Sequence, residues 1–456
     1  MPTTTRFRHL VAVFFLLFVL TVPAARVSAG PNEDLYAKIK ILTQVLYEVQ
    51  ERYVEEVKAD VLLDGAIKGM VRTLDPHSSY MTPEEMKELQ IDTQGAFTGV
   101  GIELTLSKDG ALTVVAPIDG TPAFRAGIQS RDVIVKINGK STKDMGLPEA
   151  VKLIRGEKGT PVVLTVTRET ESKPLDISII RDVIPVRSVR SEAIEDGYRY
   201  IRISNFQANT LADLKDAVEK FQAGPVPPKG LILDLRSNPG GLLDQAVKIA
   251  DLFLKEGLIV YTQGRNEAQN MKFTAQPSVL VGNYPVVVLV NEGSASAAEI
   301  LAGALQDHKR ALLLGARTFG KASVQTIIPF RDGSGLRLTT ARYYTPSGRS
   351  IQAAGIEPDI AVPSNFTGKI VREKDLAKHL KGENEGNEEA AQETDSKPEE
   401  TTKKPKTPAK PEPEQKPVWE MTPKERFTVD PQLKKAFEML KNGEVLPLLK
   451  AAKAAK

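Results

Sequence analysis

The sequence predicts an α/β protein whose core contains a mostly parallel sheet. From Ile184 to Pro363, strand-like apolar runs alternate with helical runs, which is the order that builds parallel strands joined by crossover helices. Two of those runs read as buried strands: 230–235, which is apolar except for Asp234, and 286–290, which is a continuous stretch of branched apolar residues. The chain has 456 residues, which is enough for two or three domains with their own cores.

The composition excludes several classes of function. The formal charge of +3 comes entirely from Arg6, Arg8 and Arg26, and the rest of the chain holds 58 basic and 58 acidic residues. This balance indicates no nucleic-acid partner. The absence of cysteine excludes disulfides, thiol catalysis and cysteine-ligated zinc. The four histidines lack metal-ligand spacing, so we predict neither a metal nor another cofactor.

Residues 1–29 have the pattern of a secretory signal, with basic residues followed by the apolar run 10–20. Ala29 ends a small-residue cleavage motif, and Ala25 ends a competing one. The run is short for a membrane span, although an uncleaved anchor remains an alternative. We expect export to the bacterial periplasm or cell envelope.

Residues 30–92 are predicted to be helical. Apolar residues recur at three- and four-residue steps from Leu35 to Val49. A turn around Pro76 follows, and Thr82 caps a further helix with Pro83 at its first position and Glu85 completing a capping box. His77 and Tyr80 in the turn are interpreted as structural.

Residues 93–172 change character. Gly99, Val100, Gly101 and Ile102 form a glycine-flanked strand start, and short helices and strands follow up to Thr167. This order resembles a PDZ domain, and the resemblance implies that the backbone N–H groups of this loop bind a peptide's terminal carboxylate. The glycines are equally compatible with ordinary turns.

The predicted core, residues 180–365, contains two loops that could carry chemistry. The first, RSNPGG, follows the buried strand 230–235 and ends in Gly240 and Gly241. Two successive glycines expose backbone N–H groups, as an oxyanion hole requires, although an ordinary strand-to-helix loop explains them too.

The second loop contains Ser294 and Ser296, between the strand 286–290 and a helix from Ala297 to Leu305. The N-terminus of a helix favours developing negative charge, and a desolvated lysine such as Lys321 could serve as the base. Both residues also have ordinary explanations without catalysis: Ser296 and Glu299 could form a capping box, and Lys321 could be a solvated lysine.

GSASAAEI and GARTFGKASVQ together resemble the serine–lysine site of the carboxy-terminal processing, or tail-specific, proteases, which carry a PDZ domain. The resemblance covers residues 34–361 and implies a protease core of crotonase- or ClpP-like sheets and helices with the PDZ domain inserted. It implies that Ser296 is the nucleophile, Lys321 the general base and Gln325 the residue that orients the lysine.

The same resemblance assigns the oxyanion hole to Gly240 or Gly241 together with the N–H of Ala297. Lys321 and Gln325 lie in a strand-like stretch, where they would be about 13 Å apart. Because one helical turn would bring them within about 6 Å, we predict a helical turn there. Arg155, at the end of a PDZ helix, is a candidate for reporting the PDZ position to the core, or else a solvated arginine stabilised by the helix dipole.

Residues 366–417 are rich in Lys, Glu, Pro and Thr, which predicts a disordered linker. The segment 418–456 is predicted to form helices that pack on a neighbour, such as another copy in a homo-oligomer. A membrane or envelope adaptor is a further candidate partner. The function expected is an exported serine endopeptidase acting on proteins or peptides with accessible C-termini. The alternatives are a catalytically silent PDZ scaffold and a crotonase-like acyl-CoA enzyme.

Overall fold

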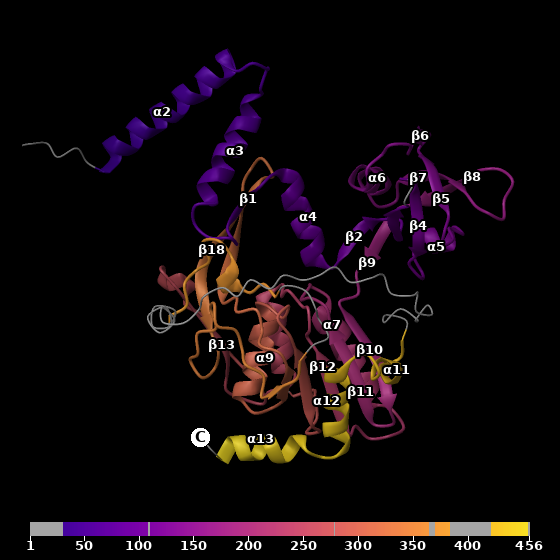
Figure 1. Ribbon diagram of the computed structural model, residues 1–456, viewed down its shortest axis with the longest axis vertical. Coiled ribbons are helices and arrows are strands. Elements are labelled where there is room, and N and C mark those ends of the chain that lie inside the picture. Colours follow the sequence, from indigo (N-terminus) through magenta and orange to yellow (C-terminus); the bar gives the residue numbers. More distant parts are fainter. Residues whose placement is uncertain (1–30, 108–109, 278, 364–369, 384–420, 455–456) are drawn as a thin grey trace, which may run out of the picture. The chain divides into compact units, whose positions relative to one another are not determined.

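A computed structural model of the protein describes residues 31–107, 110–277, 279–363, 370–383 and 421–454 (Figure 1). The predicted signal segment 1–29 and most of the predicted linker lie outside these residues. The chain divides into two compact units, residues 1–70 and 71–456. Within the described ranges, no helix has both the length and the apolar character needed to cross a membrane.

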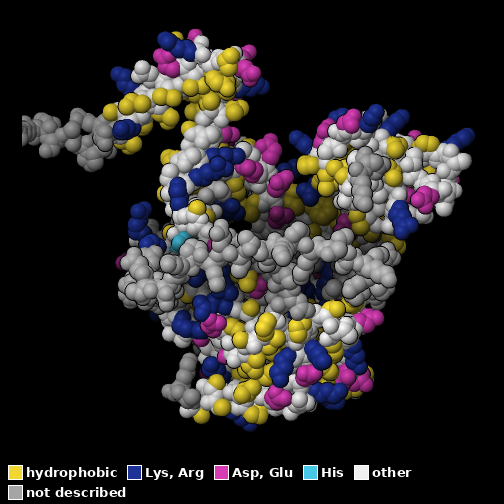
Figure 2. Space-filling view, in the orientation of Figure 1, with side chains coloured by type: hydrophobic (Ala, Val, Ile, Leu, Met, Phe, Trp, Pro, Cys, Tyr) yellow, Lys and Arg dark blue, Asp and Glu magenta, His cyan; other side chains and the backbone are white. Residues whose placement is uncertain are grey.

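The first unit contains the helix α2, Pro31–Arg52, and most of α3, Ala59–Val71, which confirms the predicted helices. The apolar positions of α2 are about half exposed, including Leu35 at 56% and Val45 at 53%. Figure 2 shows these apolar side chains along the helix surface. The predicted apolar stripe therefore exists, but this unit by itself does not bury it.

The second unit begins with a turn that joins the core. After the turn, β1, Ser79–Met81, pairs with a core strand, and α4 spans Pro83–Gln94. The predicted capping box at Thr82 is confirmed, because Thr82 and Glu85 exchange hydrogen bonds between side chain and backbone N–H. The left-handed Gly95 ends this helix.

The PDZ-like region is a six-stranded antiparallel sheet with two helices and its own apolar core. Its elements are β3 Ile102–Leu106, β4 Leu112–Pro117, α5 Pro122–Arg125, β5 Val133–Ile137, β6 Lys140–Ser141, α6 Leu147–Ile154, β7 Pro161–Thr167 and β8 Leu175–Ile180. The sheet thus continues to Ile180, beyond the expected boundary at 172. The entering strand β2, Ala96–Gly99, pairs with the leaving strand β9, Asp182–Pro185.

The core sheet has six strands in the order β10-β11-β12-β15-β16-β19. Only the first pair is antiparallel, so the predicted mostly parallel sheet is confirmed. The strands are β10 Val189–Glu195, β11 Tyr198–Ile203, β12 Gly230–Asp234, β15 Val286–Val290, β16 Leu312–Gly315 and β19 Ile360–Ala361. One apolar cluster joins this sheet to the helices α7 Thr210–Gln222, α8 Leu243–Asp251 and α9 Ala297–Asp307.

A second core sheet is antiparallel, and all its strands except β1 alternate along the chain with strands of the first sheet. It consists of β1 and of β13 Leu258–Gly264, β14 Lys272–Thr274, β17 Ser323–Pro329 and β18 Gly335–Tyr344. The short 3-10 helix η1 spans Glu267–Gln269.

Residues 370–383, which we expected to belong to the linker, instead pack on the core and contain the 3-10 helix η2, Glu373–Asp375. Glu373 is fully buried, and its N–H donates to the Phe319 carbonyl.

The C-terminal helices are α11 Pro423–Arg426, α12 Pro431–Lys441 and α13 Val445–Ala454. Helix α12 lies against the six-stranded core sheet (Figure 1). Its residues Leu433, Phe437 and Leu440 belong to the apolar cluster on that face of the sheet. Burying each such side chain stabilises the protein by about 1.5–3 kcal/mol. This helix therefore covers an apolar sheet face of its own chain, and contact of the terminal helices with a second molecule stays a prediction.

Candidate active site

The two serines differ in their surroundings. Ser294 is fully buried, and its hydroxyl donates to the Leu235 carbonyl at 2.8 Å. Ser296 is partly exposed at the start of α9, with φ 55° and ψ −117°. L residues rarely adopt this conformation, which recurs where a strand-to-helix turn presents a nucleophile. The structure thus separates an accessible, strained serine from a buried structural one.

The RSNPGG loop lies directly against Ser296. Gly240 has φ 106°, and a Cβ atom added there would lie 2.8 Å from the Ser296 Cβ and 3.0 Å from the Ala297 nitrogen. Gly241 has φ 134°, and an added Cβ would lie 2.2 Å from the Phe206 carbonyl oxygen. Both positions therefore require glycine, and both predicted loops meet at one place.

One of the two glycine N–H groups is already engaged. The Gly240 N–H donates to Asn238 Oδ1 at 2.9 Å, and the buried Asn238 side chain donates in turn to the Ile203 carbonyl at 2.9 Å. Gly241 is consequently the better oxyanion donor of the pair in this arrangement. Asn238, for which the RSNPGG motif suggested no separate role, fixes the path of the loop.

Lys321 is partly buried in the irregular stretch before β17. Burial lowers the pKa of Lys321 from its ordinary value, the Glu373 carboxylate opposes this shift, and the Arg337 guanidinium adds to it. A general base must be neutral at working pH, so the direction of the shift suits that role.

Glu299 ties the serine turn to the lysine stretch. Its fully buried carboxylate accepts from the N–H groups of Ser296 at 2.9 Å, Lys321 at 2.9 Å and Gly320 at 2.8 Å, and from the Thr318 hydroxyl. Burial raises the pKa of Glu299 to about 7, and these hydrogen bonds oppose the rise. The sequence indicated only a helix cap here, because the other donors lie about twenty residues further along the chain.

Tyr343 makes a second bridge, for which the sequence carries no signal. Its buried hydroxyl lies 3.0 Å from the Ser296 carbonyl oxygen and 2.6 Å from the Lys321 carbonyl oxygen. Together with Glu299 it holds the backbones of the serine and the lysine in a fixed relation.

The predicted helical turn between Lys321 and Gln325 is wrong. Gln325 lies in β17, where it pairs with Thr339 of β18, and its side-chain amide donates to Ser323 and Thr339. The β-branched residues that follow Gln325 favour a strand, and the ladder with β18 outweighs one local helical turn. Gln325 is therefore not positioned by a helical turn to orient the lysine.

Nor does a hydrogen bond join the Ser296 hydroxyl to the Lys321 ammonium among the described residues. Ser296 lines a cavity of about 360 Å³ with Gly240, Gly241 and Gln325. Lys321 lines a different cavity of about 500 Å³, which the segment after the core also borders through Ile370 and Val371. The two backbones are held together, whereas the side chains are not yet paired for proton transfer.

The predicted carboxylate loop of the PDZ-like region precedes the edge strand β3. Gly101 has φ 80°, and a Cβ there would lie 2.4 Å from the Thr121 Cβ, so this position also requires glycine. The carbonyls of Val100 and Gly101 are bonded within the domain by the N–H groups of Ala123 and Ile118. The free edge of β3 is where an added peptide strand could pair.

Arg155 does not meet the serine site in this arrangement. Its guanidinium stacks on the Phe97 ring, 4.9 Å from the ring centre, and Phe97 belongs to β2, the strand that enters the PDZ-like region. The reporting role of Arg155 stays a prediction, and the structure shows a contact with this connecting strand only.

Comparison with known proteins settles the family. The carboxy-terminal-processing protease of Bartonella bacilliformis is 45% identical over 384 residues, which cover 82% of this chain and 88% of the relative. The chain belongs to the carboxy-terminal processing proteases. The carboxy-terminal processing protease CtpA of Bacillus subtilis is 41% identical over 338 residues, covering 73% of this chain and 70% of the relative.

Family models agree with this assignment to the processing proteases. Residues 197–362 match peptidase family S41, residues 113–168 match the PDZ domain, and residues 24–85 match the activating protease CtpB N-terminal domain. A solved photosystem II D1 C-terminal processing protease is 30% identical, with a TM-score of 0.41, and covers 71% of this chain and 92% of that one. The protein is thus a serine-type peptidase with a PDZ domain.

The negative charge of Glu373 should affect how kcat/KM of this processing protease depends on pH. If Lys321 is the base, kcat/KM rises with pH as the lysine loses its proton. The Glu373 carboxylate favours the charged lysine, so Glu373→Gln should lower the Lys321 pKa and move the acidic limb of the profile down by about 1 pH unit. The measurement is kcat/KM for one peptide between pH 5 and 9. A limb that stays in place or moves upward contradicts the electrostatic link between Glu373 and Lys321.

Proposed function

We propose that this protein is an exported endopeptidase in which Ser296 is the nucleophile and Lys321 the general base, and that its PDZ domain binds the C-termini of protein substrates. The observation that carries the proposal is the strained Ser296 turn, packed against Gly240 and tied by Glu299 to a lysine whose pKa burial lowers. Family membership supports the peptidase activity.

In the proposed reaction, Ser296 Oγ attacks the scissile carbonyl carbon while neutral Lys321 takes the hydroxyl proton. The N–H groups of Gly241 and Ala297 stabilise the oxyanion. Collapse of the tetrahedral intermediate breaks the C–N bond, and the lysine passes its proton to the leaving amine. Water then attacks the acyl-enzyme by the same route and frees Ser296.

Gln325 enters this scheme only after a rearrangement. Its amide oxygen could accept from the lysine ammonium once the start of β17 shifts, because the present strand pairing directs the side chain to Ser323 and Thr339. The bulge between Val324 and Gln325 marks where the ladder with β18 is already irregular. We infer that pairing of Ser296, Lys321 and Gln325 accompanies such a shift.

Recognition of chain ends is assigned to the loop 99–102 and the edge of β3. The N–H groups of that loop would bind the terminal carboxylate, and the last residues of the substrate would add a strand to β3. Export rests on the signal-like pattern of residues 1–29, and the mass of the mature protein from an envelope fraction tests cleavage after Ala29.

The test of recognition compares a peptide substrate with a free C-terminus and the same peptide amidated at its C-terminus. Amidation removes the charge that the loop would bind, so we expect kcat/KM to fall by about tenfold or more. Gly101→Val, whose side chain would collide with Thr121, should show the same low rate with both peptides, whereas the exposed Ser141→Ala should behave as wild type. Equal rates for the two peptides with the wild-type protein contradict recognition of the terminal carboxylate.

A further inference from the structure

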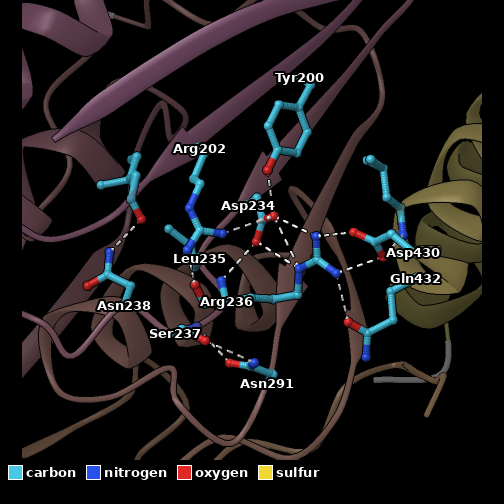
Figure 3. A network of polar contacts seen from close by, with 12 residues as sticks. Tyr200, Arg202, Asp234, Leu235, Arg236, Ser237, Asn238, Asn291, Asp430 and Gln432 are labelled. Carbon is cyan, nitrogen blue, oxygen red and sulfur yellow. Dashed lines mark hydrogen bonds and ion pairs between the residues drawn. The ribbon is translucent and has the colours of Figure 1, made fainter. Parts of the chain in front are cut away.

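Arg236, the first residue of the RSNPGG loop, lies between two carboxylates from distant parts of the chain. One is Asp234 at the end of β12, and the other is Asp430, which caps the C-terminal helix α12 (Figure 3). The side chain of Asp234 is fully buried, and those of Arg236 and Asp430 are only 15% and 17% exposed. Water therefore screens this cluster weakly, and its contacts are stronger than those of surface ion pairs.

The contacts use the whole guanidinium group. Toward Asp430, Arg236 Nη1 donates to Oδ1 at 2.8 Å and Nη2 donates to Oδ2 at 2.7 Å. Toward Asp234, Nη2 donates at 2.7 Å and Nε at 3.0 Å, and Gln432 Oε1 accepts from Nη1 at 3.1 Å. Hydrogen bonds on both sides fix the position and the plane of the guanidinium group. A lysine ammonium is not planar and could not make these paired contacts.

The backbone of Arg236 is fixed as well. Its N–H donates to Asp234 Oδ1 at 2.9 Å, and its carbonyl accepts from Arg202 Nη2 at 3.0 Å. The next residue, Ser237, has φ 54° and donates its N–H to Asn291 Oδ1 at 2.7 Å. Asn238 then continues the hydrogen-bonded path to Gly240, which lies against Ser296. Hydrogen bonds thus hold every residue of the loop from Arg236 to Asn238, and the last of them leads to Gly240.

We propose that Asp430, the N-cap residue of helix α12, is a positioning residue for the oxyanion loop. The Asp430 carboxylate accepts two hydrogen bonds from the Arg236 guanidinium on the side away from Asp234. Arg236 in turn fixes the first residue of the RSNPGG loop. The inference rests on the proposed role of the Gly241 N–H group. Without the charge of Asp430, the two guanidinium groups of Arg236 and Arg202 face the single carboxylate of Asp234, and Arg236 loses the partner that aligns its plane.

The test is Asp430→Asn in the full-length protein. Asparagine caps a helix about as well as aspartate, so α12 keeps its N-cap while the ion pair is lost. We expect kcat to fall about tenfold with KM within twofold of wild type, since a misplaced oxyanion donor weakens only the transition state. Inhibition by a peptide boronate, which forms a tetrahedral adduct, should weaken by about the same factor, while binding of the cleaved product peptide stays unchanged.

Phe437→Leu is the matched control. Phe437 packs on Tyr198 and Phe427, so its replacement loosens α12 without touching Arg236. Assayed below both melting temperatures, this variant should keep the wild-type kcat even if its Tm falls as far as that of Asp430→Asn. Should Asp430→Asn fail to fold, Gln432→Met removes a single contact of the same guanidinium and should show the same selective loss in kcat, of smaller size.

A folded Asp430→Asn protein with wild-type kcat and boronate affinity overturns the positioning role. A loss of kcat in Phe437→Leu as large as that in Asp430→Asn also overturns it, because α12 would then act only by stabilising the fold. If only Gln432→Met folds, a wild-type kcat in that variant overturns it. Ser296→Ala, assayed beside these variants, separates the two proposals. Activity that survives Ser296→Ala contradicts the proposed function, whereas activity that depends on Ser296 but not on Asp430 contradicts only this inference.

Discussion

Replacing Ser296 by alanine should abolish peptide-bond cleavage, with a fall in kcat of about 10⁴-fold or more. Lys321→Ala should have an effect of the same order, because a serine without its base is a weak nucleophile and residues that act as a unit do not contribute additively. The double variant should therefore be little slower than either single variant. The measurement is kcat for an unfolded protein or peptide substrate, with the thermal unfolding of each variant recorded beside it.

Ser294→Ala is the control for this experiment. It removes a buried hydroxyl that donates to Leu235, which should cost about 1–3 kcal/mol of stability, but it leaves Ser296 in place. Most of the activity should remain below the melting temperature. Full activity in Ser296→Ala, or total loss in a folded Ser294→Ala protein, contradicts the assignment of the nucleophile.

The second large effect is expected at Gly241. Alanine there would place its Cβ 2.2 Å from the Phe206 carbonyl oxygen at a φ of 134°, so the oxyanion loop must move. We expect kcat to fall by about 10²–10³-fold, the usual consequence of losing one oxyanion donor, together with a loss of about 1–3 kcal/mol of stability from backbone strain. The measurements are kcat, KM and the free energy of unfolding.

Gly139→Ala is the control that separates the effect of backbone strain from the effect of displacing the oxyanion loop. Gly139 has φ 79°, and an added Cβ would meet no atom within 4 Å, so this variant carries a backbone penalty in the PDZ-like region and leaves the oxyanion loop unchanged. Its kcat should equal that of the wild type. A Gly241→Ala protein that folds and keeps its kcat shows that the loop supplies no oxyanion donor.

The sequence predicted the core because its signals are local. The largely apolar runs 230–235 and 286–290 contain central strands of the parallel sheet, and the motifs around Gly240 and Ser296 each follow one of them. Strands that are neighbours in a parallel sheet end at the same edge, so the two loops meet. The sequence pattern alone left an ordinary loop open at the glycines, and the resemblance to the processing proteases assigned them and the serine to one site.

The errors arose where distant residues decide the structure. The stretch of Gln325 contains β-branched residues and pairs with β18, and this outweighed the helical turn inferred from a functional resemblance. Asp430 and Arg236 are 194 residues apart, and Tyr343 reaches the carbonyls of both Ser296 and Lys321. A single sequence contains no periodicity that reports such contacts.

The most direct test of the central claim, that Lys321 activates Ser296, is peptide mapping by mass spectrometry after reaction with a fluorophosphonate probe. The wild-type protein should carry one adduct, on the peptide that contains Ser296 and at that residue. Its rate of formation should rise with pH and fall by orders of magnitude in Lys321→Ala. An adduct on another serine, or labelling of Ser296 at an unchanged rate in folded Lys321→Ala, contradicts the claim.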